Sequence, residues 1–289
     1  MHYVQAKGIL SASNGMNMYR GCQHSCIYCD ARSKCYQINH VFEDIEVKQN
    51  APELLERALK GKRNKCMIGT GGMTDPYMPL EREQRLTRRL LEIINQYEFG
   101  LAIQTKSNLI LRDLDLLKSI NEKSKCIVQM TMTTYDEALC KKIEPNVCTT
   151  RERFEVLKTM RDQGIQTVVW LSPFLPYLND TEENICGLMD YCIEAGVYGI
   201  ICFGIGVTLR EGDREYFYEK LDEKFPGLKQ KFHARYGNAY EINSDHNDEL
   251  MSIIRLKCKE HGIVSNANKV FEYMHEYESH QEAEQLTLF

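Results

Sequence analysis

The chain has 289 residues, of which 43% are apolar and 27% charged, an ordinary composition for a globular protein of one or two domains. No apolar run approaches the ~18 residues that cross a bilayer, and no basic segment followed by an apolar one opens the sequence, so we expect a cytoplasmic protein. The net charge is −5, and the five glutamates of residues 272–289 account for all of it. A body without net charge is neither a protein that coats DNA nor an acidic one.

Six short apolar stretches rich in β-formers alternate with stretches of helical periodicity. We expect strands at residues 16–21, 66–71, 100–106, 126–133, 166–174 and 200–207. We expect helices at residues 51–60, 80–97, 111–121, 150–163 and 181–195. This alternation predicts an α/β fold, a partial (β/α)6 barrel of the TIM type with a mostly helical C-terminal extension. A doubly wound open sheet is the alternative.

The chain divides into three predicted parts. Residues 1–210 form the barrel, and residues 211–271 form the helical extension packed on it, with the clearest helix at 247–261. Residues 272–289 are rich in glutamate and lack a core pattern, so they are predicted to be an acidic flexible tail.

The strongest motif is a set of three cysteines within eight residues. Cys22, Cys26 and Cys29 follow a glycine with the spacing Cx3Cx2C. In a reducing compartment such thiols indicate metal rather than disulfides, and three thiolates can hold three irons of a [4Fe–4S] cube. A zinc site completed by His24 or Cys35 is the alternative, although neither gives a familiar zinc spacing. The other nine cysteines contain no CxxC pair, so no second cluster is predicted.

The cysteine motif, with Tyr28 before its last cysteine, resembles that of radical SAM enzymes. The resemblance implies that the fourth iron chelates the amino and carboxylate groups of S-adenosylmethionine (SAM). It further implies that an electron from the reduced cluster cleaves SAM to a 5′-deoxyadenosyl radical. A one-electron reductase such as flavodoxin or ferredoxin is then an expected partner, and the cluster loop is expected at the C-terminal face of the barrel.

Further motifs resemble the spore photoproduct lyase branch of that superfamily: residues 69–77 (GTGGMTDPY), 105–107 (TKS), 144–145 (EP) and 152–153 (ER). The resemblance implies that Gly71 and Gly72 admit the methionine amine and that Lys106 pairs with the methionine carboxylate. It also places Thr131 on the ribose and Tyr28 against the adenine. The full set expected to bind SAM is Tyr28, Gly71, Gly72, Thr74, Asp75, Lys106 and Thr131.

The sequence also departs from the lyase pattern. Asp30 stands where the lyase has a tyrosine, and Gly72 stands where the lyase has its hydrogen-donating cysteine. We therefore do not expect thymine-dimer repair by the same route. Six basic residues that follow strands either line a groove for a polyanion or are ordinary surface residues: Arg20, Arg32, Lys34, Arg112, Arg151 and Arg210.

The last five residues, Gln-Leu-Thr-Leu-Phe, resemble the peptide by which bacterial DNA polymerases and repair proteins dock on the sliding clamp. Leu286, Leu288 and Phe289 would fill an apolar pocket, and Gln285 would fix the register. An apolar tip folded back on the barrel is the alternative.

These observations predict a radical SAM enzyme that uses a [4Fe–4S] cluster and SAM and acts on nucleic acid, in DNA repair or modification, without contact with a membrane. An enzyme that modifies a peptide or protein is the first alternative. A non-catalytic iron–sulfur adaptor recruited to the sliding clamp is the second.

Overall fold

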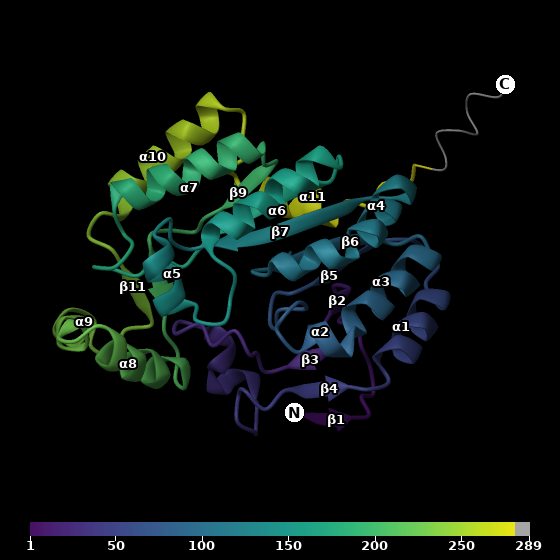
Figure 1. Ribbon diagram of the computed structural model, residues 1–289, viewed down its shortest axis with the longest axis horizontal. Helices are drawn as coiled ribbons and strands as arrows, with labels where there is room; N and C mark the ends of the chain where they lie inside the picture. The colour runs from purple at the N-terminus through teal and green to yellow at the C-terminus, as the bar shows by residue number, and fades with distance from the viewer. Residues whose placement is uncertain (281–289) are drawn as a thin grey trace.

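A parallel six-stranded sheet forms the centre of the molecule in the computed structural model, which describes residues 1–280 (Figure 1). Its strands are β2 (Gly15–Met16), β5 (Met67–Thr70), β6 (Gly100–Thr105), β7 (Cys126–Met132), β8 (Gln166–Leu171) and β9 (Gly199–Ile201). They lie side by side in chain order, and every neighbouring pair is parallel. A doubly wound sheet reverses its order at a switch point, so this order confirms the partial barrel.

Helices cover the outer face of the sheet (Figure 1). They are α1 (Ala51–Lys60), α3 (Leu86–Gln96), α4 (Leu114–Lys123), α6 (Thr150–Asp162) and α7 (Glu182–Ala195). The predicted single helix at 80–97 is wrong, because Arg85 adopts a left-handed φ of 49° and separates α2 (Glu81–Gln84) from α3. The carboxylate of Glu81 turns inward and accepts the amides of Leu86 (3.2 Å) and Thr87 (3.0 Å) at the first turn of α3.

Two predicted strands are each split between two sheets. Residues 16–21 end β2 and then form β3 (Tyr19–Arg20), which joins a small sheet of order β1-β4-β3 with β1 (His2–Val4) and β4 (Glu46–Lys48). Residues 200–207 form the end of β9 and the start of β10 (Gly206–Thr208), which pairs antiparallel with β11 (Glu241–Asn243).

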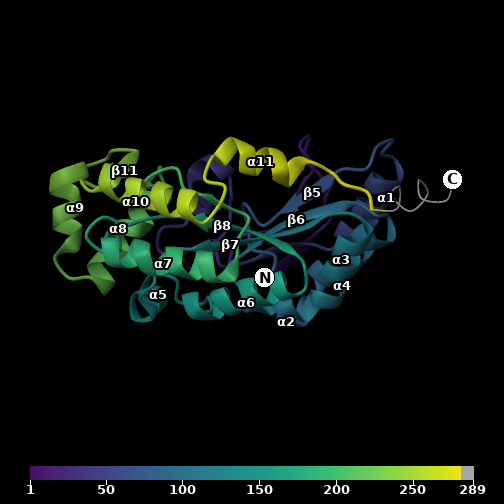
Figure 2. The ribbon, with the colours of Figure 1, turned by 90° about the horizontal axis from the view of Figure 1, so that it is seen from above.

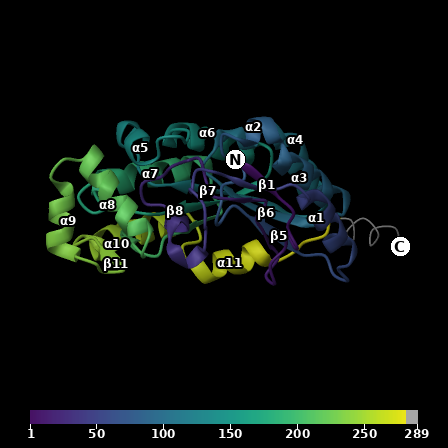
Figure 3. The ribbon, with the colours of Figure 1, turned by 90° about the horizontal axis from the view of Figure 1, so that it is seen from below.

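The predicted C-terminal extension contains α8 (Asp213–Lys224), α9 (Leu228–Tyr236), α10 (Asn247–Glu260) and α11 (Ala267–His275). Helix α11 lies across the sheet face opposite α3, α4 and α6 (Figures 2 and 3). There Val270 and Met274 pack against the inward side chains of five strands: Met67, Ala102, Ile127, Val168 and Ile201.

The predicted tail boundary at residue 272 therefore falls inside α11. Beyond this helix, Glu278 pairs with Lys125 at 2.5 Å, and the amide of His280 donates to the carbonyl of Lys123. Among residues 1–280, no helix has the length and apolar character needed to cross a membrane.

Candidate active site

The three predicted cluster cysteines lie on one loop that follows β3. Cys22 and Cys26 are buried, Cys29 is half-buried, and all three are free thiols. Gly21 opens the loop with a φ of 84°, and a Cβ there would lie 2.3 Å from the carbonyl oxygen of Phe42. Only glycine fits this position, and the amide of Cys22 donates to the same carbonyl at 3.2 Å.

The loop faces the carboxyl ends of the parallel strands across a cavity of about 720 Å³, a size typical of cofactor sites. Six of the seven residues predicted for SAM line this cavity together with all three cysteines. Thr74 is the exception: it is buried, but it is not among the lining residues. The predicted residues that the cavity brings together are Cys22, Cys26, Tyr28, Cys29, Gly71, Gly72, Asp75, Lys106 and Thr131.

The chemistry of the three thiols fits an iron–sulfur cluster. Burial raises the pKa of Cys22 to about 12 and also raises the pKa values of Cys26 and Cys29. These thiols are therefore protonated without metal, and metal binding releases their protons. The ammonium of Lys106 opposes the rise at Cys26 and Cys29, because it favours negative charge beside it.

The spacing of the sulfurs disfavours zinc. A tetrahedral Zn²⁺ with Zn–S bonds of ~2.3 Å needs thiolates only ~4 Å apart. Within the described residues, the three cysteines do not form a group whose ligand atoms all lie within 4.8 Å of one another. Neither His24 nor Cys35 completes such a group with them. The wider spacing suits a cluster of several irons, which holds its cysteines farther apart.

Asp75 connects the cysteine loop to the ends of β5 and β6. Its carboxylate accepts the amide of Tyr77 (2.8 Å), the hydroxyl of Thr105 (2.7 Å) and the amide of Lys106 (2.7 Å). The Nδ1 atom of His24, on the cysteine loop, lies 3.4 Å from the same carboxylate. Burial lowers the pKa of His24, so this ring is neutral. With its oxygens already bonded, Asp75 is a positioning residue.

Lys106 directly follows β6 and is half-buried in the cavity wall. Burial disfavours its ammonium, but the negative charge of Glu144, joined by that of Cys26 once metal binding has deprotonated its thiol, outweighs this effect, so the pKa of Lys106 is raised. Among residues 1–280, Lys106 is the one lysine or arginine that lines the cavity. Lys106 can therefore pair with a carboxylate that enters the cavity.

Tyr28 lines the cavity, but its hydroxyl is already bonded. It donates to Glu144 and lies 3.2 Å from the hydroxyl of Thr133 at the end of β7. Burial raises the pKa of Tyr28, and the charge of Glu144 raises it further. Only the ring of Tyr28 is thus free to contact a ligand, which is compatible with its predicted position against an adenine.

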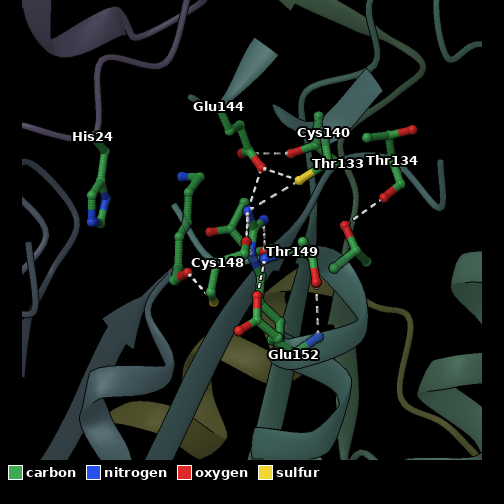
Figure 4. A network of polar contacts seen from close by, with 12 residues as sticks. His24, Thr133, Thr134, Cys140, Glu144, Cys148, Thr149 and Glu152 are labelled. Atoms are coloured by element: carbon green, nitrogen blue, oxygen red, sulfur yellow. Dashed lines mark hydrogen bonds and ion pairs between the residues drawn. The ribbon is translucent and has the colours of Figure 1, made fainter. Parts of the chain in front are cut away.

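A buried ion pair between Glu144 and Arg153 holds this part of the wall in place (Figure 4). Both side chains are 0% exposed. Arg153 also donates to the carbonyls of Thr131 (3.0 Å) and Cys148 (2.9 Å), which fastens α6 to the end of β7. Burial alone would raise the pKa of Glu144, but the charges of Arg153 and Lys106 lower it to about 2.

Gly71 and Thr131 lie on either side of β6, and Gln104 of that strand contacts both. A Cβ at Gly71, where φ is 99°, would lie 1.9 Å from the carbonyl oxygen of Gln104 in β6, so glycine is required there. The side-chain amide of Gln104 donates to the hydroxyl of Thr131 at 3.2 Å. Thr131 can still donate to a ligand, because only its acceptor capacity is used.

Two aromatic residues of the cavity wall, Trp170 and Phe203, were not predicted from the sequence as site residues. Trp170 in β8 and Phe203 after β9 line the cavity, and their ring centroids are 6.2 Å apart. Phe271 of α11 packs against both, at 5.8 Å from Trp170 and 6.4 Å from Phe203. Strand periodicity placed Trp170 on a strand, but only the course of α11 shows which rings meet.

The six basic residues considered for a polyanion groove do not line the cavity. Most have partners within the chain. Arg32 pairs with Glu43, Lys34 with Glu211, Arg112 with Glu81 and Asp113, and Arg210 with Asp30, while Arg20 donates to backbone carbonyls. These contacts favour the interpretation that the six residues are ordinary surface and loop residues and do not form a groove for a polyanion.

A family model described as the Radical SAM superfamily matches residues 16–189. This is more than half of the chain, which therefore belongs to the Radical SAM superfamily. Membership confirms the two predicted cofactors, SAM and a [4Fe–4S] cluster, and makes the protein an enzyme of the radical SAM class.

Two curated relatives show how far the similarity extends. The uncharacterized protein MJ0683 of Methanocaldococcus jannaschii is 37% identical over 172 residues, which are 59% of this chain and 63% of that protein. The uncharacterized protein Rv2578c of Mycobacterium tuberculosis is 28% identical over 234 residues, or 76% of this chain and 66% of that protein. The chain thus spans just under two thirds of the length of these relatives.

Solved structures of spore photoproduct lyase share the fold. A point mutant of that enzyme is similar with a TM-score of 0.66 at 13% identity, covering 91% of this chain and 80% of that chain. A double mutant with bound AdoMet and dinucleoside spore photoproduct has a TM-score of 0.61 at 14% identity, covering 87% and 75%. The predicted resemblance to this branch is confirmed at the level of the fold.

Proposed function

We propose that the chain uses SAM and its cluster to abstract a hydrogen atom from a nucleotide unit of a nucleic acid, in DNA repair or modification. In this proposal Cys22, Cys26 and Cys29 hold the cluster, and Lys106 pairs with the carboxylate of SAM. Gly71, Gly72, Tyr28 and Thr131 line the rest of the SAM site, and Asp75 positions the cysteine loop against it. A flavodoxin or ferredoxin supplies the electron.

The observation that carries the proposal is an exposed aromatic ring at the edge of the cofactor cavity. Phe203 lines the cavity, yet 72% of it is exposed to solvent. Trp170 and Phe271 support the ring from the protein side. An exposed ring backed by other rings is a stacking surface for a base, and such stacking contributes ~1–3 kcal/mol per base.

The charge of the cavity limits the form of the substrate. Asp30, Asp75 and Glu241 line it, and of the residues that the structure describes Lys106 alone adds a cationic side chain to the wall. A site of this kind gains little from counterion release, so contacts to the phosphates of a duplex contribute little affinity. A flipped or single-stranded base that stacks on Phe203 is the form that this cavity suits best.

Recruitment through the sliding clamp would supply the missing affinity. The predicted clamp-binding residues Gln285, Leu286, Leu288 and Phe289 lie outside the described residues, so this part rests on the sequence alone. A peptide bound to the clamp would raise the concentration of the barrel near DNA to as much as ~mM. Titration of a labelled 278–289 peptide against a bacterial sliding clamp, beside a peptide with Leu288→Ala and Phe289→Ala, tests this step.

The fold shared with a structure that contains a dinucleoside spore photoproduct adds support for a nucleotide substrate. The missing cysteine at Gly72 separates the two reactions, because this chain offers no thiol there to return a hydrogen atom. The proposal therefore covers hydrogen abstraction from a nucleotide and not the complete reaction of the lyase.

The test is SAM cleavage by the anaerobically reconstituted chain with dithionite, with and without single-stranded DNA whose sugars and thymine methyl groups carry deuterium. We expect DNA to stimulate release of 5′-deoxyadenosine and deuterium to enter that product. Phe203→Ala should lower the stimulation about tenfold or more, while Leu256→Ala, an exposed apolar residue on α10, should not.

Two results would contradict the proposal. Deuterium transfer from peptides but not from DNA or RNA would favour the peptide-modifying alternative. Failure to form 5′-deoxyadenosine with any substrate, from protein with a complete cluster, would favour the non-catalytic adaptor.

A further inference from the structure

A second group of metal-ligating side chains lies on the N-terminal sheet, away from the cysteine loop. His2 in β1, His40 in the loop before β4, and Glu46 in β4 each offer a ligand atom, and these atoms all lie within 4.8 Å of one another. His2 and Glu46 are directly opposite in the parallel β1–β4 pair. All three residues are half-buried, and none lines the cofactor cavity.

The two ring nitrogens of His40 differ in their hydrogen bonding. Its Nδ1 atom lies 2.9 Å from the carbonyl oxygen of Val41. Because a carbonyl only accepts, Nδ1 carries the proton, and the Nε2 atom of the neutral ring has a free lone pair. That Nε2 atom is buried and has no hydrogen-bond partner among residues 1–280. A buried nitrogen without a partner costs free energy, and a bound metal ion would satisfy it.

The ring of His2 has a similar arrangement. Its Nδ1 atom lies 3.0 Å from a carboxylate oxygen of Asp44, and the other carboxylate oxygen pairs with the N-terminal ammonium at 2.7 Å. Carboxylates and backbone carbonyls that hold the far nitrogen of a histidine are the usual outer partners of metal-ligating imidazoles. The rings of His2 and His40 meet edge to face, with centroids 4.9 Å apart.

We propose that His2, His40 and Glu46 bind one divalent transition metal ion, with Zn²⁺ as the best match. Two imidazole nitrogens and one carboxylate oxygen form a donor set that zinc uses, with water in the fourth position of a tetrahedron. Zinc–ligand distances of ~2.0–2.2 Å require ligand atoms ~3.4 Å apart, and the ligand atoms of the three side chains already lie within 4.8 Å of one another. The mixed nitrogen and oxygen donors suit zinc better than Mg²⁺ or Ca²⁺.

The site would join the N-terminal strand to the segment that supports the cysteine loop. Glu46 pairs with Arg20 in the β3–β4 register, two residues before Cys22. The segment between His40 and Glu46 also contains Phe42, whose carbonyl receives the amide of Cys22. We therefore assign the ion a structural role, in which it stabilises the base of the cysteine loop without taking part in SAM cleavage.

The test is metal analysis of the full chain, purified anaerobically with its cluster intact and without a histidine tag. Zinc and iron are measured together after equilibration with limiting Zn²⁺, and zinc affinity is measured by competition with a chromophoric chelator. We expect one zinc per chain in addition to about four irons. His40→Ala and His2→Ala should each weaken zinc binding at least about 100-fold without changing the iron content.

Two further variants make the test specific. Asp44→Asn removes the carboxylate charge beside the outer nitrogen of His2, together with its ion pair to the N-terminal ammonium, and should weaken zinc binding about 10-fold to 100-fold. His261→Ala removes an exposed histidine elsewhere on the surface and should leave zinc binding unchanged. Added zinc should raise the melting temperature of the unaltered chain and not that of His2→Ala. Because each chain is compared with itself, with and without zinc, this measurement is valid even where the two chains differ in stability.

Equal zinc affinity in the unaltered chain, His2→Ala and His40→Ala would overturn the proposal, as would binding weaker than tens of micromolar. Zinc that appears only as iron is lost would show that the ion occupies the cysteines instead.

Discussion

The buried ion pair of Glu144 and Arg153 gives a quantitative prediction. Replacing Glu144 with glutamine leaves the guanidinium of Arg153 in a fully buried site without a counter-charge. Breaking a buried pair in this way costs about 3–5 kcal/mol. The pKa of Glu144 gives a similar figure: lowering it from 4.5 to about 2 corresponds to ~3 kcal/mol of stability at neutral pH.

The dependence on pH follows from the sign of that shift. A carboxyl group whose pKa is lowered by folding stabilises the native state above its unfolded pKa of 4.5. This contribution is lost as the pH falls toward 2. The difference in unfolding free energy between the unaltered chain and Glu144→Gln should therefore shrink by ~2 kcal/mol between pH 7 and pH 3.

Urea unfolding under anaerobic conditions measures the effect. For a urea dependence of ~3 kcal/mol per molar, Glu144→Gln should lower the midpoint by about 1–1.5 M. Glu155→Gln is the matched control, because Glu155 is an exposed acid on the same helix as Arg153 and forms only a surface pair with Lys158. Its midpoint should change by less than about 0.3 M.

A double substitution separates the ion pair from other effects of the mutation. Replacing Arg153 with methionine in the Glu144→Gln background removes the unpaired charge and should recover part of the lost stability. The reasoning fails if Glu144→Gln unfolds at the same urea concentration as Glu155→Gln. The unfolding free energy of Arg153→Met alone is the reference for the double variant. The reasoning also fails if Arg153→Met lowers the unfolding free energy of Glu144→Gln by as much as it lowers that of the unaltered chain.

Three further predictions, made with five substitutions, test the cofactor site. Replacing Cys22, Cys26 or Cys29 with alanine should abolish the cluster, measured as iron and sulfide per chain, and dithionite-driven SAM cleavage with it; a complete cluster in any such variant would refute the ligand set. Lys106→Ala should weaken SAM binding, measured by equilibrium dialysis, about tenfold to a hundredfold, while the iron content stays unchanged. Unchanged SAM affinity would show that the charge of Lys106 does not contact SAM. Gly71→Ala should lower the melting temperature by several degrees, because its Cβ would overlap a carbonyl of β6 at a positive φ; an unchanged melting temperature would mean that the strand end shifts freely.

Local patterns in the sequence predicted the outer layer of the barrel well. The helix over residues 51–60 has the predicted bounds, because its apolar residues recur at helical spacing and a proline marks its first turn. The helix predicted at 181–195 ends as expected, because Gly196 follows it with a φ of 64°, the left-handed conformation that favours glycine at a C-cap. The cysteine spacing and the strand-end motifs likewise located one cavity, because strand ends of a parallel sheet share an edge.

The rest depends on contacts between distant segments. The break at Arg85 follows from the inward carboxylate of Glu81, which no local periodicity reveals. The sequence analysis assigns part of α11 to the tail, because the glutamate and tyrosine residues of this helix give it no clear apolar pattern. Val270 and Met274 are buried only because α11 packs on the open face of the barrel, which is a contact between distant segments. The group at His2 and His40 was missed for the same reason, since 38 residues separate the two side chains.

The position of α11 sets the order in which the protein can be assembled during synthesis. The inner face of the sheet is complete once Ile201 has emerged, but Met274, which covers that face, comes 73 residues later. At ~5–20 residues per second, this interval lasts about 4–15 s. During that time the nascent barrel is open from the side that α11 later covers, and its apolar inner wall is exposed to chaperones.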